Sequence, residues 1–159
     1  MKMKTLHIII LLAFTQTLAA QGPDSSIHSD NHENEIGIAN SPVYLLKEKA
    51  FAYSLHAHYI RGLKETKFGI GIGYERIFDE HKHNTMGIIL SYAPLEHLDL
   101  SLSPGITFDD NDAKLNFGIH LEALYEFEVG IFHIGPVAEF AYAVEDYHVS
   151  LGLHFGFGF

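Results

Sequence analysis

From near Phe51 to the last residue of this 159-residue chain, apolar residues alternate with small or polar ones at a period of two. Successive side chains of a β-strand point to opposite faces, so this alternation predicts strands with one apolar face. The last segment shows the pattern best, because Val149, Leu151, Leu153, Phe155, Phe157 and Phe159 alternate with Ser150, Gly152, His154, Gly156 and Gly158. The sequence therefore predicts an all-β chain.

Eight strands are expected, and most have the length that crosses a bilayer. We place them at residues 35–46, 50–61, 66–78, 84–93, 97–108, 113–128, 131–144 and 147–159. At a rise of about 3.3 Å per residue and a tilt of about 40°, such strands span the hydrocarbon layer. Closing the sheet pairs every backbone group within the lipid. The prediction is an eight-stranded antiparallel transmembrane β-barrel.

Residue size decides which face of the barrel meets lipid. The apolar face carries large side chains such as Tyr74, Ile88 and Phe117, and the opposite face carries most of the 14 glycines. An eight-stranded barrel has an interior just wide enough for side chains to fill it. The large residues are therefore predicted to face outward, with aromatic girdles near the strand ends. A soluble lipocalin-like barrel is the alternative.

Strand one is the least regular of the eight, because its alternation is poor around Asn40. Pro42, Pro104 and Pro136 fall inside expected strands, where each removes a backbone donor. We expect β-bulges at these three prolines.

The chain is predicted to have three parts. Residues 1–20 combine Lys2 and Lys4 with an apolar run and small residues before Gln21, which is typical of a secretory signal peptide. Residues 21–34 are polar and are expected to form a flexible periplasmic tail, and residues 35–159 form the barrel. The chain has no cysteine, and its formal charge of −10 argues against nucleic acid as a partner.

The signal peptide, the strand count, the girdles and the terminal Phe155-Gly156-Phe157-Gly158-Phe159 resemble small outer-membrane β-barrels of the OmpA, OmpX and OmpW type. The resemblance covers about residues 35–159 and implies export to the outer membrane of a Gram-negative bacterium. It also implies contact with outer-membrane lipid and lipopolysaccharide, and recognition of the terminal aromatic residues by the barrel assembly machinery. We expect a monomer with a structural or accessory role in the envelope.

The inward face carries histidines and carboxylates without lysine or arginine in mid-strand. Residues two apart on a strand project to the same side, so His56 with His58, and likewise His120 with Glu122, could each chelate one divalent metal. Imidazole and carboxylate together suit Zn²⁺ or a similar cation. The alternative is a hydrated His–carboxylate network that fills the lumen without metal.

The connections expected on the outer side are rich in the same residue types. Candidate ligands there are His81, His83, Asp109, Asp110 and Asp112. These residues could bind a divalent cation, or bridge lipopolysaccharide phosphates through Ca²⁺ or Mg²⁺. Ordinary solvated loop charge explains the same composition.

Two further functions compete with the accessory role. A narrow path for protons or small cations would use the lumenal histidines and Glu122. A lipid A-modifying enzyme would need a Ser–His–acid set at the outer rim, where only His83 with Thr85 and His148 with Ser150 are close in sequence. Neither pair carries a recognisable motif, so we expect no catalytic activity.

Overall fold

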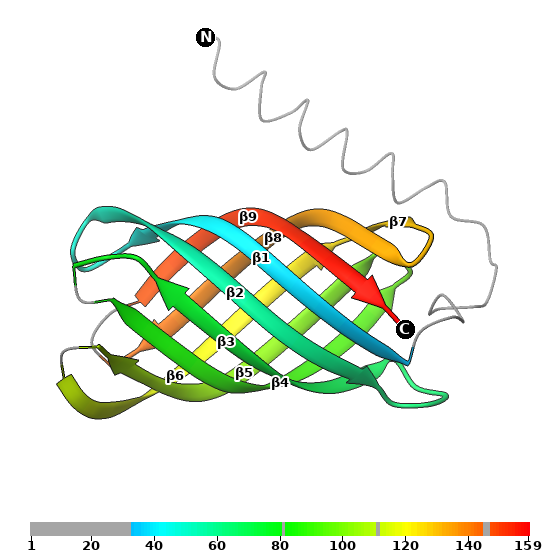
Figure 1. The fold of residues 1–159 in the computed structure, drawn as a ribbon, viewed down its shortest axis with the longest axis horizontal. Coiled ribbons are helices and arrows are strands. Elements are labelled where there is room, and N and C mark those ends of the chain that lie inside the picture. Colours follow the sequence, from blue (N-terminus) through cyan, green and yellow to red (C-terminus); the bar gives the residue numbers. More distant parts are fainter. Residues whose placement is uncertain (1–32, 81, 111, 145–146) are drawn as a thin grey trace, which may run out of the picture.

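The computed structural model describes residues 33–80, 82–110, 112–144 and 147–159, which form a closed antiparallel β-barrel (Figure 1). The strands are β1 (Asn34–Leu45), β2 (Ala50–Gly62), β3 (Phe68–Ile77), β4 (His83–Leu95), β5 (Leu98–Asp109), β6 (Asp112–Tyr125), β7 (Phe127–Val129), β8 (Phe132–Ala143) and β9 (Tyr147–Gly158). The predicted eight-stranded architecture is confirmed, because β7 only continues β6 beyond Glu126. The predicted signal peptide and residues 21–32 of the predicted tail lie outside the described residues.

Consecutive strands pair around the barrel, and two further pairings close it. Strand β1 pairs with β9, and β6 pairs with β8. At the seam, the backbone N–H of Asn34 donates to the Phe159 carbonyl at 3.0 Å, and the Phe159 N–H donates to the Asn34 carbonyl at 2.9 Å. The described strands therefore leave no open sheet edge, as a lipid environment requires.

The two ends of the barrel differ in what they carry. The end with Asn34 and Phe159, here called the terminal end, also holds the connections after β2, β4 and β7. The opposite end, here called the loop end, holds the connections after β1, β3, β5 and β8 (Figure 1). All of these connections are short, so the barrel wall makes up almost all of the described structure.

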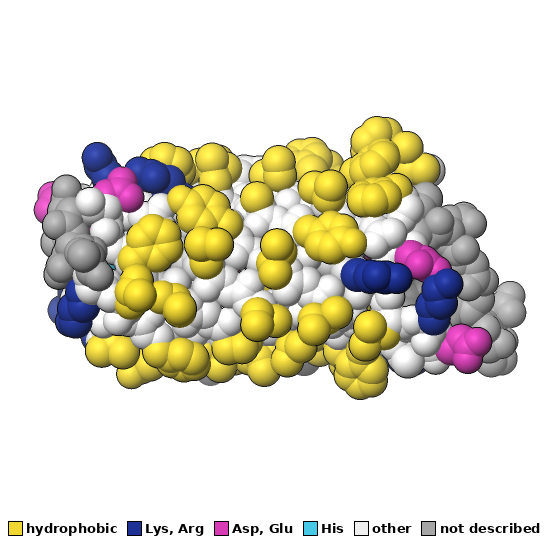
Figure 2. Space-filling model, turned by 60° about the horizontal axis from the view of Figure 1, so that its bottom comes forward, with side chains coloured by type: hydrophobic (Ala, Val, Ile, Leu, Met, Phe, Trp, Pro, Cys, Tyr) yellow, Lys and Arg dark blue, Asp and Glu magenta, His cyan; other side chains and the backbone are white. Residues whose placement is uncertain are grey.

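The outer face of the barrel is apolar. Its exposed side chains include Ile72, Phe117 and Leu151, all on the parity predicted to meet lipid. Figure 2 shows apolar side chains over the long middle of the barrel and charged side chains gathered at its ends. So large an exposed apolar surface is typical of a membrane-facing wall. No helix of the described residues is long and apolar enough to cross a membrane.

Aromatic rings pair along the outer face near the terminal end, where a girdle was expected. The rings of Phe68 and Tyr92 lie 4.9 Å apart between centroids, and those of Phe132 and Phe157 lie 5.6 Å apart. Cross-strand pairs of this kind stabilise neighbouring strands in addition to anchoring them at the membrane surface.

Strand β1 keeps its alternation, but its inward side chains are mostly apolar. Ala39, Val43 and Leu45 are buried in the lumen, while Ile36 and Ile38 face outward. Because both faces of this strand carry apolar residues, the period of two is hard to see in its sequence. Asn40 lies on the outer parity, and its side-chain amide donates to the Leu153 carbonyl at 3.2 Å, which satisfies part of its polar group.

The prediction of β-bulges at the three prolines is wrong. Pairing between β1 and β9 lapses beside Pro42 and resumes in the same register, and pairing between β4 and β5 does the same beside Pro104. A proline removes one donor without inserting a residue, so the flanking pairs keep their alignment. The register shifts in fact lie between Tyr92 and Leu95 and between Phe108 and Asp109.

The third proline lies opposite the break that separates β6 from β7. The predicted single strand 113–128 is interrupted at Glu126, whose backbone N–H donates to the His97 carbonyl at 2.8 Å. A Cβ atom on Gly135 would overlap the carbonyl oxygen of Tyr125, so a side chain there would force the backbone at the break to move. This break places the Glu126 carboxylate beside His133 and His154.

Candidate functional site

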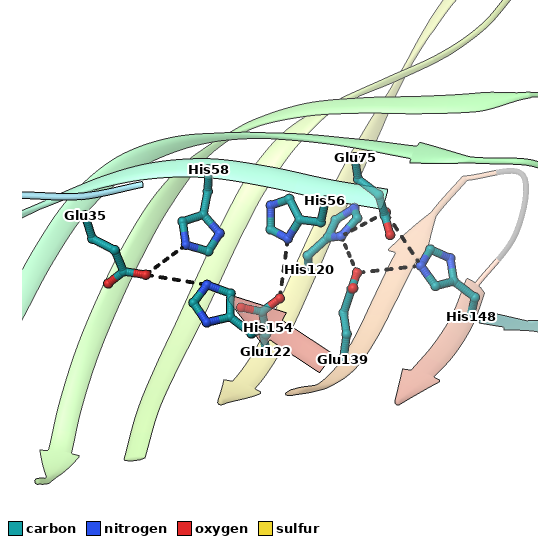
Figure 3. Close-up of polar contacts among 9 residues, drawn as sticks. All are labelled: Glu35, His56, His58, Glu75, His120, Glu122, Glu139, His148 and His154. Carbon is teal, nitrogen blue, oxygen red and sulfur yellow. Dashed lines mark hydrogen bonds and ion pairs between the residues drawn. The ribbon is translucent and has the colours of Figure 1, made fainter. Parts of the chain in front are cut away.

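The lumen contains a row of histidines and carboxylates contributed by β1, β2, β3, β6, β8 and β9 (Figure 3). In mid-strand, the inward face of the described strands carries no lysine or arginine, and Lys114, near the loop end of β6, is exposed. The carboxylates of this row therefore have imidazole rings as their charged or polar partners. The row runs from the loop end to the terminal end.

Four side chains from four strands meet in the first group, here called the four-residue cluster: Glu75, His120, Glu139 and His148. His120 Nδ1 lies 2.5 Å from Glu139 Oε1 and 3.6 Å from Glu75 Oε2. His148 Nε2 lies 3.6 Å from the same Glu139 oxygen and 3.9 Å from the same Glu75 oxygen. All four residues lie on the inward face, so the cluster is enclosed by the barrel wall.

A single His–carboxylate pair forms the middle of the row. His56 Nδ1 lies 3.4 Å from Glu122 Oε2. The strand register places this pair next to the four-residue cluster, because His56 is the cross-strand partner of Glu75 and Glu122 is the partner of Glu139. Gly73 makes room for the His56 ring, since a Cβ atom there would lie 2.8 Å from Nε2.

Toward the terminal end, the row continues with two stacked imidazole rings. The His58 and His154 rings lie 5.1 Å apart between centroids, and both face Glu35 Oε1, at 3.2 Å from His58 Nε2 and 3.5 Å from His154 Nε2. The His56 and His58 rings meet edge to face, with 5.3 Å between their centroids. Contacts thus run without interruption from the middle pair to Glu35.

An acidic vestibule opens at the terminal end of the barrel. This cavity has a volume of about 620 Å³, and Glu35, Asp99, Glu126 and His133 line it. Within it, His133 Nδ1 lies 3.3 Å from Glu126 Oε1. The excess of carboxylates gives the vestibule a negative charge that would concentrate cations at this end.

Apolar side chains close the lumen on the loop side of the row. Val43 is 0% exposed, and Leu45 and Ile77, the last residues of β1 and β3, are also buried. Nearer the terminal end, Ala39, Leu124 and Val137 form a small apolar cluster beside the polar row. The interior is therefore packed with side chains on the loop side of the row, and the vestibule opens at the terminal end.

The structure only partly groups the four lumenal residues that the sequence suggested as ligands. His56 and His58 are neighbours, but their nearest carboxylates differ, being Glu122 and Glu35. His120 and Glu122 project to the same side of β6, yet His120 bonds Glu139 while Glu122 faces His56. Of the four candidates, His120 alone belongs to the four-residue cluster.

Two of the outer-loop candidates, His83 and Asp110, contact different partners. His83 Nδ1 lies 2.5 Å from Asp79 Oδ2, while Asp110 accepts hydrogen bonds from Arg76 Nη2 at 2.7 Å and Asn84 Nδ2 at 2.9 Å. The Asn84 amide and the Arg76 guanidinium lower the pKa of the Asp110 carboxyl. Backbone pairing places Asp109 opposite both His83 and Asp112. His81 lies outside the described residues, as does the Asp112 side chain.

Sequence reasoning did not select Glu75, Glu139 and His148 as ligands, although all three lie on the inward parity. They sit on three different strands, so no spacing along the chain connects them to His120. The usable signal was the strand register, because antiparallel pairing places Glu139 opposite Glu122 and His148 opposite Ala141 on neighbouring strands. That register can be assigned only when the turns and bulges are known.

The two Ser/Thr–His pairs considered for catalysis have other partners in the structure. Thr85 Oγ1 shares a hydrogen bond with Thr107 Oγ1 at 3.2 Å, and His83 Nδ1 is hydrogen-bonded to Asp79 Oδ2. The His148 ring faces Glu75 and Glu139 inside the barrel, away from lipid.

Comparisons with known proteins show the fold of the chain. No family model and no curated protein matches it. Among solved structures, neisserial surface protein A is 11% identical with a TM-score of 0.59, and the match covers 79% of this chain and 96% of that chain. The attachment invasion locus protein Ail of Yersinia pestis is 14% identical with a TM-score of 0.51, covering 79% and 96%.

A designed protein is equally similar. A structure from the de novo design of transmembrane β-barrels is 12% identical with a TM-score of 0.56, and the match covers 80% of this chain and 98% of that chain. The predicted resemblance to small eight-stranded outer-membrane barrels is thus confirmed for the fold. Because a designed barrel matches as well as natural proteins do, this similarity carries no particular activity.

Proposed function

We propose that the protein is a non-enzymatic accessory barrel of a Gram-negative outer membrane, with a lumen closed to solutes. The packing of the lumen carries this proposal: Val43, Ile89 and Val137 are 0%, 2% and 1% exposed. An eight-stranded barrel whose interior is filled by side chains leaves no aqueous pore. With an apolar outer wall and short connections, the described chain offers a stable membrane-spanning body rather than a solute channel.

Single-channel recording in planar bilayers tests the closed lumen. The wild-type protein should show no conductance above the bilayer baseline. A Val43→Gly/Leu45→Gly variant, which removes two side chains that close the loop side, should leak and provides the matched control. Stable conductance steps from the wild-type protein would refute the closed lumen.

The membrane location and the partners form part of the same proposal. The apolar wall would contact outer-membrane lipid, and the loop end would face lipopolysaccharide on the cell surface. Phe155 and Phe157 are exposed on the outer face of β9, and Phe159 is exposed directly after it, where the barrel assembly machinery could bind them. Fractionation of cells should place the protein in the outer membrane, and deletion of Phe159 should reduce the heat-modifiable folded form seen on gels. Cross-linking in detergent should give a monomer.

The absence of enzymatic activity can be tested directly. Expression in a Gram-negative host should leave the mass spectrum of lipid A unchanged. A mass shift that a His148→Ala variant abolishes would instead favour a lipid A-modifying enzyme.

A narrow path for protons or small cations is the second candidate, and the row of lumenal histidines and carboxylates favours it. Imidazole and carboxylate groups in contact can pass protons along a chain of hydrogen bonds. Proton flux into vesicles, followed with an internal pH dye, should then exceed that of empty vesicles. His58→Leu should abolish the difference, because it interrupts the row between His56 and Glu35. Equal flux in the presence and absence of the wild-type barrel would remove this candidate.

A further inference from the structure

The four-residue cluster combines two carboxylates and two imidazoles in one enclosed place. Glu75 comes from β3, His120 from β6, Glu139 from β8 and His148 from β9, so the cluster crosses the lumen (Figure 3). One ligand atom from each residue lies within 4.8 Å of the other three. Residues that converge from four strands form a cage whose position the barrel wall fixes, unlike a group of charges on one loop.

Several polar atoms in this cage have no hydrogen-bond partner. Both carboxylate oxygens of Glu75 and Nε2 of His148 are buried and unsatisfied, although Glu75 is only 3% exposed and His148 7% exposed. The hydrogen bond between His120 Nδ1 and Glu139 Oε1 satisfies one side of the cluster only. Burying a carboxylate without a partner is unfavourable, so these atoms call for a positively charged group beside them.

The charge of the cage matches a divalent cation. Two carboxylates carry two negative charges, and two neutral imidazoles add none, so a dication would make the centre neutral. Lysine and arginine, the usual partners of buried carboxylates, are absent in mid-strand from the inward face of the described strands. A metal ion would replace the proton shared by His120 and Glu139 and would reach the unsatisfied atoms of Glu75 and His148 at the same time.

We propose that Glu75, His120, Glu139 and His148 bind one Zn²⁺ ion in the lumen. Zinc prefers four ligands at about 2.0–2.2 Å in a tetrahedron, which separates the ligand atoms by about 3.3–3.6 Å. The four His–carboxylate separations of 2.5, 3.6, 3.6 and 3.9 Å bracket this range, and all four ligand atoms lie within 4.8 Å of one another. Small side-chain rotations therefore suffice to form the site. Two imidazole nitrogens favour zinc over Ca²⁺ and Mg²⁺, which prefer oxygen ligands.

Two other groups in the lumen offer three ligands each, and both include Glu35. One is Glu35 with His58 and His154, and the other is Glu35 with Glu126 and His133. Since they share Glu35 and lie beside the open vestibule, water competes with any metal there more easily. The vestibule pair Glu126 and His133 therefore provides a matched control for the four-residue cluster.

Isothermal titration of Zn²⁺ into the full chain, folded in detergent, tests the site. We expect one ion per barrel with micromolar or tighter affinity, and the gel shift between boiled and unboiled samples confirms folding. Removing a residue that only supports a metal ligand typically weakens binding by about 10- to 100-fold. The variants His148→Ala and Glu75→Gln each remove a direct ligand, so each should weaken zinc binding by at least about 10-fold. The control Glu126→Gln/His133→Ala should keep the wild-type affinity.

Three results would overturn the site: no zinc binding by the folded wild-type barrel, unchanged affinity in both ligand variants, or loss of binding in the control alone. If a ligand variant fails to fold, the zinc X-ray absorption spectrum of the wild-type protein decides. Four nitrogen and oxygen neighbours with imidazole scattering support the site, and an all-oxygen shell refutes it. The proposal is independent of the closed lumen, because conductance and zinc binding are measured separately.

Discussion

His58 and His154 stack across β1, the strand that separates β2 from β9, with their ring planes inclined by only 11°. The contact is possible because the residue between them is Gly37, which pairs with His58 on one side and with Gly156 on the other. A Cβ atom on Gly37 would overlap both imidazole rings. A residue without a side chain thus lets two strands that are not neighbours share one polar contact.

Replacing this glycine should disturb the row of histidines. We expect Gly37→Ala to lower the free energy of unfolding by about 1–3 kcal/mol, because an added methyl group in a filled interior forces side chains to move. Urea unfolding in lipid vesicles measures the change. Gly62→Ala is the matched control, since its Cβ would lie 3.7 Å from the nearest atom, an ordinary contact. Equal stability of the two variants would show that the rings are not packed against Gly37.

The His56–Glu122 pair should contribute to stability through its carboxylate. Glu122→Leu removes the group that lies 3.4 Å from His56 Nδ1 and leaves the ring without this partner inside the barrel. The expected loss is about 1–3 kcal/mol, the usual cost of an unsatisfied buried polar group. Thermal unfolding followed by circular dichroism should show a lower midpoint for Glu122→Leu than for Glu122→Gln, which keeps an amide near the ring. An unchanged midpoint for both variants would contradict this role.

A charge placed on the outer wall tests the membrane-facing assignment. Ile119 lies at the middle of β6 on the outer parity, so Ile119→Arg should cost about 2–4 kcal/mol of folding free energy in lipid. Leu115→Arg, nearer the loop end of the same strand, should cost only about 0–1 kcal/mol because the side chain reaches the headgroups. Refolding yields and urea titrations in vesicles compare the two. A cost that does not depend on depth would argue against a bilayer-spanning wall.

The loop end should show a pH dependence set by Asp110. Hydrogen bonds from Asn84 and Arg76 lower the pKa of this carboxyl below its ordinary value of 3.8. A group with a lowered pKa in the folded state stabilises the fold above its unfolded pKa, and that contribution disappears as the pH falls through the folded value. The stability difference between wild type and Asp110→Asn should therefore shrink when urea unfolding is repeated at strongly acid pH. If the stability difference between the two proteins persists in acid, where Asp110 is protonated, the carboxylate charge is not the source of that difference.

Several properties of this protein followed from its sequence alone. The period of two fixed which side chains share a face, because alternate residues of a strand must point in opposite directions. Residue size then fixed the direction of each face, since large side chains such as Phe117 and Leu151 do not fit inside an eight-stranded barrel. Strand number and strand ends followed with small errors, the largest being the break at Glu126 inside the expected strand 113–128.

The grouping of the lumenal residues was decided only by the tertiary structure. His120 meets Glu139 and Glu75 rather than the nearby Glu122 because strand tilt and register, not spacing along one strand, determine which inward side chains meet. The apolar residues on the inward face of β1 hid its alternation, and their role in closing the lumen is visible only once the barrel is closed. Sequence thus determined the faces of the barrel, because they depend on local geometry. Contacts across the lumen depend on the alignment of all the strands at once, which no single segment specifies.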